Sequence, residues 1–198
     1  MATTRPTLQE SALLVIDVQD SFKATPRWER RNNRAMEANV DLLIRAYRAA
    51  GLPVFYILHS DPDEGFQTTS PHYKLMDFLE PRPDEPVLHK TTRNCFTSTP
   101  LQRMLTQLGV RRLAVTGIQM EQCCETTARL AADLGYEVDF VLDATLTFPI
   151  PHMVDGRLAG ELGVAEIEER TCFALRGRFA RIVDTARLAQ ELQAPAAP

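Results

Sequence analysis

The sequence lacks the features of a membrane-spanning or secreted protein. No stretch approaches the roughly 18 uninterrupted apolar residues that a transmembrane helix needs. Residues 1–6 lack the positively charged start and the apolar core of a secretory signal. The sequence therefore favours a cytoplasmic protein without a membrane partner.

Cysteine is scarce and is not arranged for metal binding. The four cysteines, Cys95, Cys123, Cys124 and Cys172, form no CxxC pair and match no zinc-ligand spacing. Disulfides are rare in the cytosol. We therefore expect four free thiols and no structural zinc.

Positive charge is not concentrated, and lysine is almost missing. The net charge is −4, and the 22 Lys and Arg residues are interleaved with 26 Asp and Glu residues. A nucleic-acid-binding protein needs a clustered basic face, so we expect a small-molecule partner and no nucleic acid. Lysine occurs only at Lys23, Lys74 and Lys90, which leaves few candidates for a mechanism that needs an amine.

Short apolar runs alternate with segments of helical period. Six runs are typical of strands buried on both faces of a parallel sheet: 12–17, 53–58, 86–89, 112–117, 137–143 and 179–183. Helical periods, each followed by a glycine that suits a C-cap, lie at about 29–50, 99–108, 121–134 and 164–176. This order predicts the α/β class: a three-layer αβα sandwich, Rossmann-like, around a mainly parallel six-stranded sheet.

One domain is expected, at residues 1–193, because a chain of this length usually builds a single core. Residues 194–198 are expected to form a disordered tail. Two long loops, 59–85 and 143–163, interrupt the regular pattern. Loops of this length are often lids or binding segments, so we expect these two and the loop 23–35 to shape the pocket.

Three chemically active side chains follow strand ends. Asp17 ends the first run, Lys90 follows the third, and Cys123 comes six residues after Gly117, which ends the fourth. Ligands of open α/β sheets bind beyond the carboxyl ends of the strands, so a carboxylate, an amine and a thiol are predicted to meet there. We expect the helix dipole and Lys90 to lower the pKa of the Cys123 thiol, and Asp17 to accept its proton.

Each of these residues also has a structural interpretation. An acid after a first strand often caps a helix or orders a loop, and a lysine at a strand end is often solvated. A cysteine in a helix is often a small core residue. Periodicity does not separate Cys123 from Cys124, because both lie within reach of the apolar stripe of their helix.

Three blocks, taken together in order and spacing, resemble the isochorismatase-like cysteine hydrolase superfamily, which includes N-carbamoylsarcosine amidase and the nicotinamidases. The blocks are Leu14–Phe22, Lys90–Leu101 and Val115–Arg129. The resemblance covers residues 10–190 and implies the isochorismatase-like hydrolase fold. It also implies a catalytic triad of Asp17, Lys90 and Cys123, with Cys123 rather than Cys124 as the nucleophile.

The resemblance further implies a backbone arrangement and a reaction course. A cis peptide bond between Ile118 and Gln119 would turn the Gln119 N–H toward the same point as the Cys123 N–H, forming an oxyanion hole. Asp17 would take the thiol proton and the thiolate would attack a carbonyl carbon. Ammonia or an amine would then leave, and water would hydrolyse the thioester.

Two departures from the family pattern bear on the substrate. Met120 replaces the usual threonine and is expected to make the pocket floor more apolar. No histidine stands two residues after Asp61, so the metal site of nicotinamidases is not expected, nor is any cofactor; His59 and His72 are expected to be loop or pocket residues. The other pocket residues are expected to be Gln19, Phe22, Trp28 and Phe148.

The sequence thus predicts a non-nicotinamidase hydrolase that cleaves a C–N bond of a small amide, carbamoyl or ureido compound, and that forms a homodimer or larger homo-oligomer. Three alternatives stay open. A vinyl-ether hydrolase of the isochorismatase type would use Asp17 as an acid and would not need Cys123. A catalytically silent family member would act as an assembly subunit, and a receiver module would need a phosphoacceptor Asp that the middle strands do not supply.

Overall fold

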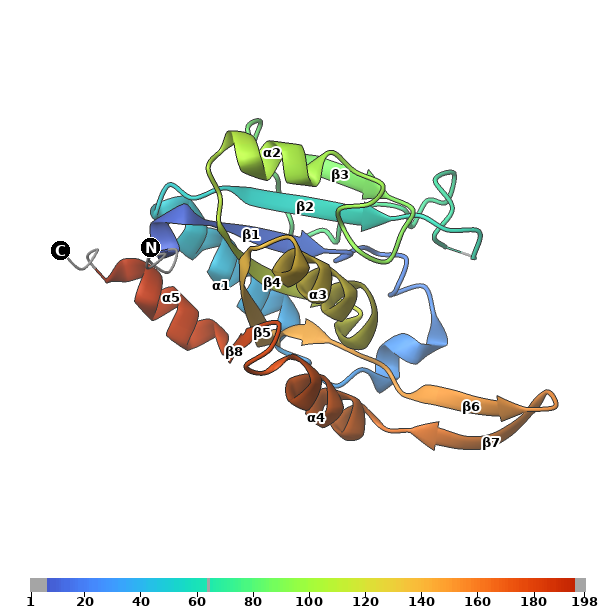
Figure 1. Cartoon of the computed structure of the whole chain (residues 1–198). Coiled ribbons are helices and arrows are strands. Elements are labelled where there is room, and N and C mark those ends of the chain that lie inside the picture. The colour runs from blue at the N-terminus through green and yellow to red at the C-terminus, as the bar shows by residue number, and fades with distance from the viewer. Residues whose placement is uncertain (1–6, 64, 195–198) are drawn as a thin grey trace.

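The computed structural model describes residues 7–63 and 65–194 (Figure 1). Of the expected tail, Ala194 forms a bend, and residues 195–198 lie outside the described part. No helix within the described residues is long and apolar enough to cross a membrane.

A six-stranded sheet forms the centre of the molecule. Its strands are β1 (Ser11–Ile16), β2 (Val54–His59), β3 (Val87–Lys90), β4 (Arg112–Ile118), β5 (Glu137–Leu146) and β8 (Arg181–Val183). They lie in the order β3-β2-β1-β4-β5-β8, and every neighbouring pair is parallel. The predicted α/β class and sheet are confirmed. The strand order reverses between β1 and β4, which is where ligands bind in open parallel sheets.

Helices cover both faces of this sheet (Figure 1). One face carries α1 (Met36–Ala49) and α5 (Thr185–Gln193), and the other carries α2 (Leu101–Gln107), α3 (Glu125–Asp133) and α4 (Val164–Leu175). Side chains alternate between the two cores along each strand: Leu13 and Val15 of β1 pack in the first core, and Leu14 and Ile16 pack in the second. Burial on both faces explains why the central strands β1, β2 and β4 are largely apolar, whereas the edge strand β3 alternates exposed and buried residues.

The helix expected over 29–50 begins later, at Met36, and residues Pro26–Arg30 form a separate 3-10 helix. Between the two, the Asn33 side-chain amide donates to the backbone carbonyls of Asp143 and Thr145 at the end of β5. These bonds hold the chain against the sheet and compete with continued helix. The helix expected over 121–134 is also divided, into a π-helical turn over Met120–Cys124 and then α3.

Helix α5 was not predicted, although its signals are present. The Asp184 carboxylate caps it by accepting from the Arg187 N–H at 2.7 Å. Leu188 and Leu192 stand four residues apart and pack into the first core.

The expectation of an irregular loop over 143–163 is wrong. Strand β5 continues to Leu146, and an antiparallel hairpin of β6 (Ile150–Val154) and β7 (Arg157–Leu162) extends beyond the carboxyl edge of the sheet (Figure 1). The turn residues Asp155 and Gly156 both have positive φ, 49° and 74°, as a type I′ turn requires. An Asp-Gly pair is a hairpin signal, but the prediction from strand periodicity did not take it into account.

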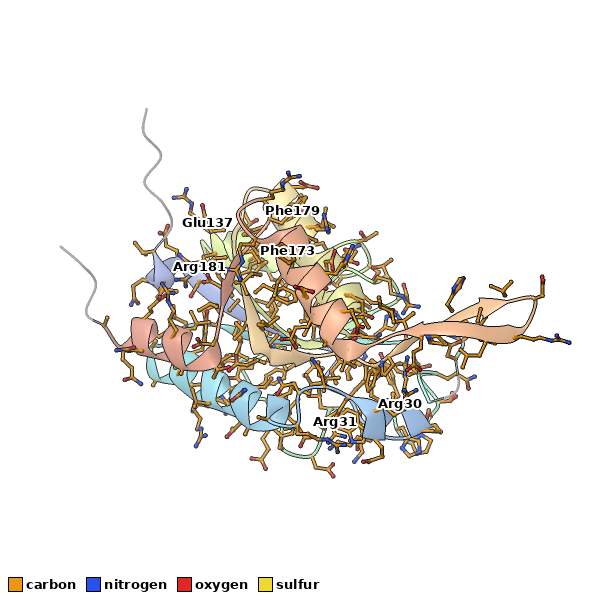
Figure 2. All side chains as sticks on the ribbon, turned by 90° about the horizontal axis from the view of Figure 1, so that it is seen from below. Arg30, Arg31, Glu137, Phe173, Phe179 and Arg181 are labelled. Atoms are coloured by element: carbon orange, nitrogen blue, oxygen red, sulfur yellow. The ribbon has the colours of Figure 1, made fainter. Side chains whose placement is uncertain are left out.

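The hairpin is tied to the body of the protein at its base. Two hydrogen bonds of 2.8 and 2.6 Å join the Arg30 guanidinium to the Glu161 carboxylate of β7, and Figure 2 shows Arg30 on the 3-10 helix near this base. Met153 and Leu158 of the hairpin are exposed. The expected homodimer or larger homo-oligomer stays a prediction.

Candidate active site

Gly117 allows β4 to approach β1 closely at the point where the strand order reverses. Its φ is +117°, and a Cβ at this position would lie 1.9 Å from the carbonyl oxygen of Ile16. Only glycine fits such a backbone contact. The close approach places the segment after β4 directly beside Asp17, the residue after Ile16.

Asp17 lies in a strained backbone position and is wholly buried. Its φ is +53°, a left-handed conformation that costs a non-glycine residue of order 1–3 kcal/mol and is typical of functional sites. The Asp17 N–H donates to the Ile57 carbonyl of β2 at 2.9 Å. One carboxylate oxygen, Oδ2, accepts from the Lys90 ammonium at 2.8 Å, and the other, Oδ1, has no hydrogen-bond partner within the described part of the chain.

Lys90 reaches Asp17 from two strands away. It is the last residue of β3, which is separated from β1 by β2, and its side chain is wholly buried. The ammonium also contacts the Cys123 sulfur at 3.3 Å. Burial opposes the charge, but the combined attraction of Asp17, Cys123 and Cys95 outweighs it and raises the pKa of Lys90, so the amine remains a cation.

Cys123 lies on the π-helical turn, with its sulfur facing Lys90 and a cavity. The Cys124 sulfur faces the sheet, 3.8 Å from the Thr116 carbonyl. Periodicity could not separate the two cysteines because only the packing of this turn on β4 determines which sulfur is turned away from the core.

The expected lowering of the Cys123 pKa is wrong. Burial and the neighbouring Asp17 carboxylate raise this pKa, and Lys90 lowers it by less. The resting site therefore holds a neutral thiol beside a Lys90–Asp17 ion pair. A carboxylate with an unused oxygen next to a thiol is the arrangement needed for a base that takes the thiol proton when substrate arrives.

The backbone before Cys123 contains a cis peptide bond, between Ile118 and Gln119. Gln119 and Cys123 line the same cavity. The Gln119 carbonyl accepts from the Gln122 and Cys124 N–H groups at 3.1 and 3.2 Å. The Gln119 side-chain amide donates to the Glu121 carboxylate, which keeps this turn closed.

A cavity of about 190 Å³ opens in front of Cys123. It is lined by Phe22, Arg27, His59, Asp61, Asp63, Phe66, Arg93, Gln119, Gln122 and Cys123. Of the expected pocket residues from the loops, Phe22 therefore lies in the lining, as does His59. His72 is exposed and outside it.

Four other expected pocket residues are not in that lining. Gln19 is buried and uses its side-chain amide to hold the backbone of His59, donating at 3.1 Å and accepting at 2.8 Å. Phe148 stacks on Phe22 at 5.8 Å, and Trp28 packs against Phe148 in turn. Met120 is fully buried in the core on the α3 side.

Sequence reasoning missed the charged part of the cavity. Arg27, Asp61, Asp63 and Arg93 come from three separate segments, none of which has a regular pattern pointing to the site. The Arg93 guanidinium lies 2.5 Å from His59 Nε2 and 3.3 Å from an Asp61 oxygen. His59 Nε2 thus lies between this guanidinium, which only donates, and an Asp61 carboxylate oxygen at 3.1 Å, which only accepts.

This arrangement does not suit the metal site of nicotinamidases. The only histidine beside Asp61 in the cavity lining is His59, and both contact a guanidinium that would repel a metal cation. The described residues contain no group of three His, Cys, Asp or Glu side chains suited to a metal ion.

A larger cavity, of about 540 Å³, lies elsewhere, at the carboxyl ends of β5 and β8. It contains none of Asp17, Lys90 and Cys123. Its polar side chains already have structural partners: Asn33 binds β5, and Asp184 caps α5. The smaller cavity is therefore the candidate active site.

Comparisons with known proteins identify the family. Residues 11–160 match the isochorismatase domain. The chain is 32% identical to Nicotinamidase 3 of Arabidopsis thaliana over 94% of this chain and 91% of that protein. It is 38% identical to a streptothricin hydrolase of Streptomyces noursei over 71% of this chain and 56% of the relative.

The solved structures show the same fold. A crystal structure of a putative hydrolase of the isochorismatase family from Chromobacterium violaceum is 29% identical and superposes with a TM-score of 0.85, covering 97% of this chain and 98% of that one. A putative isochorismatase from Burkholderia xenovorans is 27% identical with a TM-score of 0.79, covering 98% and 92%.

Proposed function

The chain belongs to the isochorismatase family of hydrolases, and on that premise we propose that it cleaves a C–N bond of a small amide through a thioester on Cys123. One observation carries this proposal: the Lys90 ammonium contacts both the Asp17 carboxylate, at 2.8 Å, and the Cys123 sulfur, at 3.3 Å. A base, a cation and a nucleophile thus share one buried point that opens onto a cavity.

The first half of the reaction forms the thioester. Asp17 Oδ1 takes the thiol proton, and the sulfur attacks the carbonyl carbon of the amide. Lys90 remains charged and stabilises the developing thiolate. The backbone N–H groups of Gln119 and Cys123 hold the oxyanion, a contribution typically worth about 2.7–4 kcal/mol of barrier for one donor.

The second half releases the acid. Asp17 gives its proton to the departing nitrogen, and the C–N bond breaks to release ammonia or an amine. A water molecule then gives a proton to Asp17 and attacks the thioester carbonyl. The C–S bond breaks, the acid product leaves, and the Cys123 sulfur recovers its proton.

Two relatives support an amide as substrate. One is named a nicotinamidase and another a streptothricin hydrolase. The metal site of nicotinamidases does not fit the cavity lining here, so we propose an amide, carbamoyl or ureido substrate other than nicotinamide. The volume of about 190 Å³ is below the range of roughly 300–1,000 Å³ typical of ligand pockets, which favours a small compound.

Ammonia release over a panel of carbamoyl, ureido, maleamate-like and aromatic amides tests the proposal. Cys123→Ala should reduce kcat on any accepted amide by at least a thousandfold, and Cys172→Ala, which changes a partly exposed thiol outside the cavity, should not. Trapping of a Cys123 acyl adduct by mass spectrometry would add direct support. Ammonia release that survives Cys123→Ala would exclude the thiol mechanism. A vinyl-ether hydrolase with Asp17 as the acid would release ammonia from no compound of the panel.

A further inference from the structure

Arg27 is a cation at the cavity that has no ion-pair partner among the described residues. Its guanidinium carbon lies 5.5 Å from the ring centre of Phe22 and 5.0 Å from that of Phe148. It forms no ion pair with any of the described residues. The rings hold the side chain beside the cavity through cation–π contacts, but they leave all its N–H donors available to a ligand.

The other charges of the cavity compensate one another or are well hydrated. Arg93 contacts Asp61 at 3.3 Å, and Asp61 also accepts from the Asp63 N–H at 2.9 Å. Asp63 is exposed and attracts Arg27 without forming an ion pair with it. His59 adds no charge near neutral pH, because burial lowers its pKa below the usual value of 6.5.

Arg27 is the cation of the cavity that contacts no carboxylate among the described residues. The two rings partly desolvate its guanidinium and lower the pKa of Arg27, although the residue remains exposed. An anion binding there meets N–H donors that no described residue uses, and the rings at 5.5 and 5.0 Å exclude water from one side of the contact. A guanidinium group can also donate two parallel hydrogen bonds to one carboxylate.

The cavity also limits the length of the ligand. Arg27 and Cys123 line the same space of about 190 Å³, so one small molecule can meet both. Phe22 and Phe66 pack edge to face at 4.9 Å and form a small apolar wall in an otherwise mostly polar lining. This wall suits a short hydrocarbon spacer between the group that meets Arg27 and the group that meets Cys123.

We propose that the substrate is a short amide that carries a carboxylate, with the carboxylate bound by Arg27, the spacer against Phe22 and Phe66, and the amide carbonyl at Cys123. This assignment rests on the proposed amide hydrolysis and adds the substrate class and a specificity residue to it.

Succinamate and succinamide form a matched pair that tests the assignment, because they differ only in a carboxylate and a neutral amide. The wild-type protein should have a kcat/KM at least tenfold higher for succinamate, since a charge-assisted hydrogen-bonded contact is typically worth a factor of ten or more. Arg27→Gln should lower that preference at least tenfold, mainly through the KM of succinamate, and Arg27→Lys should restore part of it. Arg34→Gln, which changes an exposed arginine outside the cavity, should leave the preference intact.

Binding of succinate separates the two proposals, because it needs no turnover. Succinate should raise the melting temperature of the wild-type protein, and of Cys123→Ala, but not of Arg27→Gln. If no amide is hydrolysed and this pattern is still found, the amidase proposal fails and the carboxylate site stands. If succinamate and succinamide are hydrolysed equally well, or if succinate binds Arg27→Gln as it binds the wild type, the carboxylate site is overturned.

Discussion

The Lys90 ammonium and the Asp17 carboxylate form an ion pair of 2.8 Å between two side chains that are both wholly buried. Burying two charges costs several kcal/mol each, and the attraction between them offsets that cost only when both are present. The pair is therefore a weak source of net stability but is sensitive to the loss of one member. Its position against the Cys123 sulfur, at 3.3 Å from Lys90, gives a functional reason for keeping it.

Lys90→Met should lower the free energy of unfolding by about 3–5 kcal/mol, because it leaves the Asp17 charge buried without a partner. Urea unfolding at pH 7 measures this loss. The double variant Asp17→Asn with Lys90→Met should recover part of it. Arg45→Met provides the control, since it breaks an exposed ion pair with Asp41 at 2.9 Å and should cost less than about 1 kcal/mol. A loss of unfolding free energy as small as this in Lys90→Met would contradict the argument.

Asp17→Asn should abolish turnover while making the Cys123 thiol more reactive toward iodoacetamide at pH 7. Burial and the Asp17 charge raise the pKa of Cys123, and Lys90 lowers it, so removing the Asp17 charge leaves burial opposed by Lys90 and makes the thiolate easier to form. Peptide mass spectrometry can measure the alkylation of Cys123 at each pH from 6 to 10. The pH of half-maximal alkylation should be lower in the variant than in the wild type. An unchanged or higher pH of half-maximal alkylation would show that Asp17 does not control the thiol.

Gly117→Ala should destabilise the protein by about 3 kcal/mol or more. The added Cβ meets the Ile16 carbonyl oxygen at 1.9 Å in a left-handed conformation, so strain and overpacking act together. Gly109→Ala is the matched control: its φ is +68° and a Cβ there meets nothing within 4 Å, so only the left-handed penalty of about 1–2 kcal/mol applies. Thermal unfolding of both variants tests whether β4 and β1 need this contact; equal losses would argue against it.

Glu191→Gln should reduce stability at neutral pH but not at the acid end. Hydrogen bonds from Arg181 and Arg187 lower the pKa of Glu191 from 4.5 to about 2, so the unfolded state binds a proton more readily than the folded state. The contribution of Glu191 is therefore complete above pH 4.5 and is lost as the pH falls toward 2. Urea midpoints for the wild type and the variant should differ at pH 7 and converge at acid pH. Glu169→Gln is the control, because Glu169 is exposed and has no ion pair among the described residues. This control should show no such trend.

Local patterns determined most of the fold. The six strands of the sheet were predicted because each contains a short apolar run; the central runs are buried on both faces, and the edge strand β3 buries alternate residues. Hairpin β6–β7 and helix α5 were missed although the sequence holds their signals, the Asp155–Gly156 turn and the Asp184 cap. The late start of α1 could not be read locally, because Asn33 binds a strand more than a hundred residues away.

The sequence by itself determined the types of residue at the strand ends. The order of its three motifs indicated the family, and the resemblance named Asp17, Lys90 and Cys123 as the candidate triad. Only the tertiary structure decided which sulfur meets Lys90, which way the Cys123 pKa moves, and that Arg27 and Arg93 stand at the cavity. The physical reason is that desolvation and charge–charge attraction depend on distance in space. Residues such as Arg27, Arg93 and Cys123 come together only when the loops of separate βα units fold over the same edge of the sheet.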